Sequence, residues 1–390
     1  MTYDFDREID RRGTLSIKWD FAREFGKPEG VLPLWVADMD FPAPDCVNAA
    51  LRAAADHGIY GYSDVKEDYA DAVIGWFSRF FGWKAEREWL VKTPGVVFAI
   101  ANAVRAFTEA GDAVMITPPV YYPFKNVAEA NGRRVIESEL VIENGRYRMD
   151  FCDIERKIVD NNVKMFIFCS PHNPVGRVWT KDEIRTLGSI CRSRGVFVVS
   201  DEIHCDFTLP GHTHRIFDSV CPENRERVMI CTAPSKSFNL AGLGCSNIFI
   251  PDKSARESFE RELSKNGFGG VNKMGLVAAQ AAYTGGEEWL REVKTYMRAN
   301  LDFLRDYLRE YLPEVRLVEP EGTYFAWLDF SALGLSPKEL DALVLNRAKL
   351  WLDAGSIFGE CGGQYQRVVL ACTRKTLAEA LERLRRAVRG

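Results

Sequence analysis

The stretch Arg227-Val-Met-Ile-Cys-Thr-Ala-Pro-Ser-Lys-Ser-Phe-Asn239 joins a short apolar run to a polar turn that contains a lysine. The run, Arg227–Thr232, is apolar nearly throughout, which is typical of a strand buried on both faces of a mainly parallel sheet. Helical patterns alternate with further runs of this kind, at Ala113–Thr117, Val163–Cys169, Val196–Ser200 and Ser246–Ile250. This alternation predicts an α/β domain of three layers.

Polar side chains stand directly after three of these runs: Asn173, Asp201 and Lys236. Each is a weak signal alone, because a lysine there is usually solvated, an acid often caps a helix, and an asparagine between prolines usually makes a turn. In an open α/β sheet, however, ligands bind beyond the carboxyl ends of the strands. The three residues together therefore predict a ligand site at one edge of the sheet.

The two ends of the chain differ from this central pattern. Residues 1–46 are irregular and rich in aromatic residues and proline, and residues 287–390 alternate helix and strand patterns in an α+β order. A chain of 390 residues also exceeds the roughly 250–300 residues that one core serves. We expect a large domain at 47–286 and a smaller domain at 287–390, with the segment 1–46 packed on the smaller one.

Composition excludes several classes of function. The formal net charge is −4 with no block of like charge, which argues against nucleic acid or an anionic membrane as the partner. The ten cysteines are scattered, without a C-x-x-C pair or zinc-ligand spacing, so we expect no metal site and a reducing compartment. The start of the chain is polar and acidic, unlike a signal peptide, and no apolar run is long enough to span a membrane. A cytoplasmic protein is expected.

The order of the three strand ends resembles that of the fold-type-I pyridoxal-5′-phosphate (PLP) enzymes, the class I and II aminotransferase superfamily. Three finer strings resemble the cystathionine and cysteine-S-conjugate β-lyases of the MalY/PatB type. They are Leu34-Trp-Val-Ala-Asp-Met-Asp-Phe41, Ser200-Asp-Glu-Ile-His204 and Glu321-Gly-Thr-Tyr-Phe-Ala-Trp-Leu-Asp329. The resemblance covers essentially the whole chain. It implies the fold-type-I PLP-transferase fold, with PLP as the cofactor.

The resemblance also implies roles for the residues at the strand ends. Lys236 would hold PLP as a Schiff base and, once displaced by substrate, would take the α-proton. Asp201 would pair with the protonated ring nitrogen, and Asn173 would donate to the ring 3′-oxygen. His204 stands where many aminotransferases have tyrosine, and would either bond the same oxygen or support Asp201.

The phosphate needs fixed N–H donors, and an expected helix after Pro94 offers them at its positive end. The expected phosphate ligands are the backbone groups of Gly95, Val96 and Val97, the hydroxyl of Ser235, and Tyr62 from a neighbouring subunit. Two positions depart from the pattern of many relatives: Ala233 replaces a hydroxyl residue, and Gly244 replaces a phosphate-binding arginine.

Further residues are assigned to the ring and the substrate by the resemblance. Tyr121 would stack on the pyridine ring. Arg374 would clamp the substrate α-carboxylate through two parallel hydrogen bonds, and Trp35 would contact the substrate. The glycine-rich segment 266–274 is expected near the mouth of the pocket.

The implied activity is β-elimination, in which a cysteine thioether gives a thiol, pyruvate and ammonia. An aminotransferase of the same fold is the alternative, because both reactions start by removing the α-proton. A non-catalytic regulator on this scaffold is a more distant one. A Rossmann-type dehydrogenase is excluded, since no G-x-G-x-x-G sequence joins a first strand to a helix. The expected partners are a small amino acid substrate and a second copy of the chain.

Overall fold

The computed structural model describes residues 2–390 and contains a seven-stranded sheet in the order β2-β10-β9-β8-β7-β3-β4. All of its strands run parallel except β10, which is antiparallel to both of its neighbours. The predicted α/β class with a mainly parallel sheet is confirmed. The strands are β2 (Leu90–Thr93), β3 (Ala113–Ile116), β4 (Arg134–Glu137), β7 (Val163–Cys169), β8 (Phe197–Asp201), β9 (Val228–Thr232) and β10 (Ser246–Phe249).

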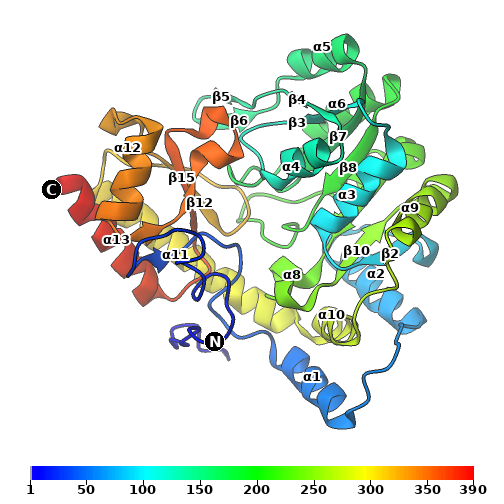
Figure 1. Cartoon of the computed structure of the whole chain (residues 1–390), viewed down its shortest axis with the longest axis horizontal. Coiled ribbons are helices and arrows are strands. Elements are labelled where there is room, and N and C mark those ends of the chain that lie inside the picture. The colour runs from blue at the N-terminus through cyan, green and yellow to red at the C-terminus, as the bar shows by residue number, and fades with distance from the viewer. Residues whose placement is uncertain (1) are drawn as a thin grey trace.

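The central strands are apolar because helices cover both faces of the sheet. Successive residues of β7 enter different cores: Phe166 and Phe168 pack on one face, and Met165 and Ile167 on the other. Helices α3 and α9 cover the second of these faces, as seen on the right of Figure 1. The helices of this part are α1 (Asp45–His57), α2 (Glu67–Phe81), α3 (Val96–Phe107), α4 (Pro123–Ala130), α5 (Phe151–Asn161), α6 (Lys181–Ser193), α7 (Phe217–Val220), α8 (Pro234–Ser237), α9 (Lys253–Lys265) and α10 (Lys273–Gly285).

A second, four-stranded antiparallel sheet in the order β11-β12-β15-β14 forms a smaller unit with its own core. It lies beside the large sheet, together with α12 and α13 (Figure 1). Its elements are α11 (Glu287–Tyr311), β11 (Arg316–Val318), β12 (Phe325–Asp329), α12 (Pro337–Ala342), β13 (Leu350–Trp351), β14 (Asp353–Ala354), β15 (Tyr365–Val369) and α13 (Arg374–Arg389). A separate two-stranded hairpin consists of β5 (Val141–Glu143) and β6 (Arg146–Arg148).

The helix α11 joins the two units. Its first half places Trp289 and Val293 in a core of the large unit, and its second half places Leu304 and Leu308 in the core of the small unit. A domain division at residue 287 therefore cuts the chain where a single helix begins to serve both cores, and it stays a proposal.

The N-terminal segment packs against the small unit and α11. Strand β1 (Leu32–Pro33) pairs in parallel with β13, and the backbone N–H groups of Thr2 and Tyr3 donate to the Glu292 carboxylate on α11. The dark blue N-terminal chain in Figure 1 follows this path. Over residues 2–390, no helix combines the length and the apolar character that crossing a bilayer requires.

Candidate active site

Lys236 lies on the one-turn helix α8, directly beyond the carboxyl end of β9. Its Nζ donates a hydrogen bond to the Ala37 carbonyl at 2.8 Å. Burial and, next, the nearby Arg367 lower the pKa of the Lys236 amine to about 8, against the opposing effect of Asp38 and Asp201. A buried amine with a lowered pKa keeps a substantial neutral fraction near neutral pH, so it can act as a nucleophile and as a base.

Asp201 ends the neighbouring strand β8 and is buried. Its Oδ1 accepts the N–H of Ile203 at 3.2 Å. Burial raises the pKa of the Asp201 carboxyl to about 7, because its charge is poorly solvated there. A cation placed against this carboxyl would restore its charge, and a protonated ring nitrogen is such a cation.

His204 is also buried, and its ring packs edge-on against Tyr324 and Phe325 with centroids 5.6 and 5.1 Å away. Burial holds the pKa of the imidazole well below its usual value, so the ring is neutral. Within residues 2–390, His204 Nδ1 has no hydrogen-bond partner. A buried polar atom without a partner is costly, which favours a bound group that satisfies it.

Asn173 follows β7 and is held by Arg367, which is not among the predicted site residues. Its Oδ1 accepts a hydrogen bond from Arg367 Nη1 at 2.9 Å. This bond uses the oxygen of the amide and leaves the Nδ2 hydrogens for another acceptor. Tyr121, beyond β3, lies near Arg367 and Asp201, whose charges act on its hydroxyl. Burial is the main cause that raises the pKa of Tyr121.

The prediction that Arg374 lies in this cluster is wrong. Arg374 begins α13, its Nε donates to Asn300 Oδ1 at 2.8 Å, and its guanidinium lies 4.6 Å from the Phe303 ring centre. Arg367, in β15, takes the expected place: it contacts Asn173, the Trp35 carbonyl and the Asp353 carboxylate. The two arginines lie seven residues apart (374 − 367) on either side of the turn between β15 and α13.

A signal for Arg367 was present in the sequence. It directly precedes the apolar run Val368–Ala371, and only 3% of its surface is exposed in the fold. An arginine in the interior of a buried strand needs partners, which makes it a stronger functional candidate than one at the start of a helix.

Trp35 joins the cluster through its backbone and its ring. Its carbonyl accepts from Arg367 Nη2 at 2.8 Å, and its ring stacks on Trp351 with centroids 4.3 Å apart. Two polar atoms of this pair of residues, Trp35 Nε1 and Arg367 Nε, are buried and have no partner among residues 2–390.

The expected phosphate ligands lie at the start of α3. Gly95 is the N-cap residue, and no side chain caps this end. The first N–H groups, which include those of Val96 and Val97, therefore have no partner within the helix and point out of its positive end. Gly244 lies against this loop, since a Cβ built on it would be 3.3 Å from the Pro94 carbonyl oxygen. Ser235 is on the same turn as Lys236.

Within one chain, Tyr62 and the segment 266–274 lie outside this cluster. Tyr62 is fully exposed, as are large parts of Ile59 and Tyr60. The segment 266–274 joins α9 to α10 and flanks α3, where Phe268 packs against Phe98 with ring centroids 5.5 Å apart. Its position next to the helix that offers the N–H groups is compatible with an effect on the pocket mouth.

The arrangement fits PLP. A reactive amine, a buried carboxylate that lacks a bonded cation, and an uncapped helix start correspond to the aldehyde, the ring nitrogen and the phosphate of that cofactor. Three further buried atoms, on His204, Trp35 and Arg367, have no hydrogen-bond partner among residues 2–390. The part of the chain that the structure describes holds no group of three or more His, Cys, Asp or Glu side chains suited to a metal ion.

Comparisons with known proteins agree with this reading. The family model for aminotransferase class I and II matches residues 29–384. The chain is 43% identical to cystathionine β-lyase PatB of Bacillus subtilis over 384 residues, which is 98% of this chain and 99% of that protein.

Two solved structures with bound PLP are also similar. Cystalysin from Treponema denticola is 36% identical with a TM-score of 0.95, over 100% of this chain and 99% of that chain. The C-S lyase from Staphylococcus hominis is 32% identical with a TM-score of 0.93, over 100% of this chain and 98% of that one.

Proposed function

The chain belongs to the class I and II aminotransferase family, and we propose that within it the protein is a PLP-dependent carbon-sulfur β-lyase. It would convert a cysteine thioether, such as cystathionine, to a thiol, pyruvate and ammonia. The observation that carries this proposal is the full-length identity of 43% to a cystathionine β-lyase, on a chain that keeps Lys236, Asp201 and Asn173 at one edge of the sheet.

PLP, when bound, supplies an electron sink for the electrons released at the substrate Cα. The residues of the chain would bind the cofactor and move the protons. Lys236 would bind the cofactor covalently and, as a free amine whose pKa burial lowers, would take the α-proton. Asp201 would hold the proton on the ring nitrogen, because burial raises the pKa of its carboxyl and a neighbouring cation favours the charged form.

Arg367 replaces Arg374 as the proposed clamp for the substrate α-carboxylate. Its guanidinium is fixed by Asn173, the Trp35 carbonyl and Asp353, and its buried Nε is still without a partner. A planar, prefixed donor suits a carboxylate better than a flexible ammonium does. Asn173, whose oxygen is used by Arg367, would present its Nδ2 to the ring 3′-oxygen.

The first test is a pair of assays on the purified protein with added PLP. With cystathionine as substrate, pyruvate and a free thiol are expected in equal amounts. With an amino acid and a 2-oxo acid, exchange of the amino group is expected to be much slower. Fast amino-group exchange without thiol release would contradict the β-lyase proposal and favour an aminotransferase.

We also propose a homodimer with shared active sites, supported by the exposed side chains of Ile59, Tyr60 and Tyr62. Tyr62 would reach the phosphate of the neighbouring subunit. A cytoplasmic location is proposed as well, and the ten free cysteines support it.

The dimer proposal predicts complementation between two inactive variants. When Lys236→Ala and Tyr62→Ala proteins are mixed, unfolded and refolded together, about a quarter of wild-type activity should return. About half of the dimers would then be mixed, and each of these has one intact site. Each variant refolded alone is the control. A fully active monomer in sedimentation at assay concentration would contradict the proposal.

A further inference from the structure

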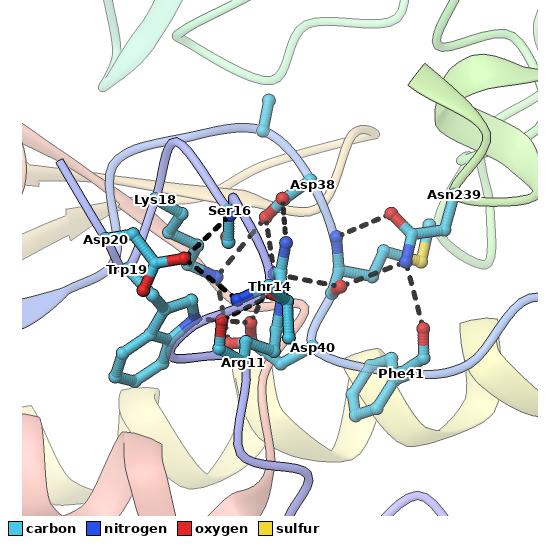
Figure 2. Close-up of polar contacts among 12 residues, drawn as sticks. Arg11, Thr14, Ser16, Lys18, Trp19, Asp20, Asp38, Asp40, Phe41 and Asn239 are labelled. Atoms are coloured by element: carbon cyan, nitrogen blue, oxygen red, sulfur yellow. Dashed lines mark hydrogen bonds and ion pairs between the residues drawn. The ribbon is translucent and has the colours of Figure 1, made fainter. Parts of the chain in front are cut away.

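A compact turn in the N-terminal segment is built around Asp20 (Figure 2). The Asp20 carboxylate accepts the backbone N–H groups of Gly13, Thr14 and Ser16 at 2.8, 3.1 and 3.0 Å. These bonds lower the pKa of Asp20, that from Gly13 most, so the carboxylate stays charged and the turn keeps its shape. The turn places Lys18 on its inner side, where the side chain is completely buried.

Four charged residues, Arg11, Lys18, Asp38 and Asp40, form a cluster that we call the N-terminal clasp. Lys18 Nζ lies 2.8 Å from Asp40 Oδ2 and 3.5 Å from Asp38 Oδ1. The Arg11 guanidinium contacts the same two carboxylates at 2.6 Å (Asp38) and 2.7 Å (Asp40). Burial alone would raise the pKa of Asp40, but Lys18 and Arg11 hold it below its usual value. Two cations thus balance two carboxylates in a largely buried place.

The clasp is connected to the reactive lysine through one short loop. Asp38 directly follows Ala37, whose carbonyl accepts both Lys236 Nζ at 2.8 Å and the Tyr324 hydroxyl at 3.0 Å. Two residues further on, Met39 exchanges backbone hydrogen bonds with the Asn239 side chain at 3.0 Å each. Asn239, seen beside this loop in Figure 2, stands three residues after Lys236, so the loop is tied both to the lysine and to the turn that follows it.

We propose that Arg11 and Lys18 are positioning residues of the active site, which hold the Ala37 carbonyl against the Lys236 amine and neutralise the carboxylates beside it. The inference rests on the proposed role of Lys236. It extends the site to a part of the chain more than two hundred residues away, since Lys236 and Lys18 are 218 positions apart (236 − 18).

The charges around Lys236 predict the direction in which each clasp variant shifts the pKa of the Lys236 nitrogen. Asp38 and Asp201 favour the protonated nitrogen, and Arg367 disfavours it. His204 and Tyr324 face the same space and are neutral there, because burial lowers the pKa of the first and raises that of the second. Loss of a clasp cation leaves Asp38 less neutralised, which favours the protonated Lys236 nitrogen. Loss of a clasp carboxylate leaves excess positive charge, which disfavours it.

The test compares variants of opposite charge in the holoenzyme, by titrating with pH the visible absorbance of the cofactor bound to Lys236. Lys18→Met should move the midpoint up and Asp40→Asn should move it down, each by about half a pH unit. One charge at roughly 10 Å exerts about one pH unit at an effective dielectric constant of about 20, and salt screening at about 0.1 M ionic strength reduces this to about half a unit. Lys18→Arg should restore the wild-type midpoint. Acetylation of the Lys236 amine in the full-length apoprotein, followed by peptide mass spectrometry across pH, should show the same order.

Asp218→Asn is the matched control. Asp218, on α7, is buried and paired with Arg225 at 2.8 Å. The variant therefore loses a buried carboxylate from an ion pair that does not touch the clasp. It should lower the melting temperature without moving the midpoint. If Lys18→Met does not fold, Arg11→Gln tests the same upward shift of the midpoint, because it also removes a clasp cation. The Arg11 side chain is partly exposed and therefore easier to replace.

Shifts of the same direction in Lys18→Met and Asp40→Asn, or no shift in either, would overturn the positioning role while leaving Lys236 as the reactive lysine. A wild-type protein that carries PLP on another lysine would instead overturn the proposed function itself. The two failures are therefore distinguished by the wild-type protein alone.

Discussion

Replacement of Lys236 by alanine is expected to lower kcat/KM for cystathionine by about a thousand-fold or more. The amine is both the covalent holder of the cofactor and the base, and loss of a general base alone costs roughly 10²- to 10⁴-fold. The protein should still fold, because the Lys236 side chain contributes one hydrogen bond, to the Ala37 carbonyl. The purified variant should also lack the covalently bound cofactor that makes the wild-type protein yellow.

Borohydride reduction followed by peptide mapping checks this expectation directly. The pyridoxyl label should appear on Lys236 in the wild-type protein and on no lysine in the variant. Lys294→Met is the control, since burial also lowers the pKa of Lys294, but the charged group that acts most on this amine is Asp206. Label on Lys294, or an active Lys236→Ala protein, would remove Lys236 from its role.

The strand ends could be predicted from the sequence because local patterns determine them. Apolar runs such as Val163–Cys169 are buried on both faces, and parallel strands bring their carboxyl ends to one edge. Asn173, Asp201 and Lys236 therefore had to lie near each other once the runs were identified. The start of α3 was predictable for the same reason, since Gly95 precedes a clear helical pattern.

The N-terminal clasp could not be predicted, because its contacts join residues far apart in the chain. The buried Lys18 lies in a stretch without helical or strand periodicity, and a lysine in such a stretch is usually exposed. In the sequence, Asp38 and Asp40 stand out only as part of the string Leu34–Phe41 that resembles the β-lyase family. Their partners, Arg11 and Lys18, are set by the fold of the N-terminal turn, which the sequence pattern does not specify.

The choice between the two arginines failed for a related reason. Both stand in the same short stretch, and a shift of a few residues in the position of a strand end decides which one faces the site. Strand β15 ends at Val369, so Arg367 is within the sheet and Arg374 begins the next helix. The apolar run Val368–Ala371 after Arg367 was a signal for that arginine, but the run alone does not fix which of the two positions faces the site.

The two arginines also give the second large effect that the structure predicts. Arg367→Ala is expected to lower kcat/KM by about 10- to 150-fold, which corresponds to a charge-assisted pair worth roughly 1.5–3 kcal/mol. The loss should reach kcat as well as KM, because the clamp also aligns the Cα bond that must break. Arg367→Lys should recover little, since it keeps the charge but loses the planar fork.

Arg374→Ala is the matched comparison, because it removes the same side chain seven positions away (374 − 367) from a different set of contacts. There the guanidinium bonds Asn300 and packs on Phe303, so its loss should lower the melting temperature and change kcat/KM by less than about threefold. Cofactor content, measured from the absorbance of the purified proteins, should stay near wild type in both variants. If Arg374→Ala lost more activity than Arg367→Ala at equal cofactor content, the clamp would belong to Arg374 after all, in a form of the protein in which α13 begins closer to the site.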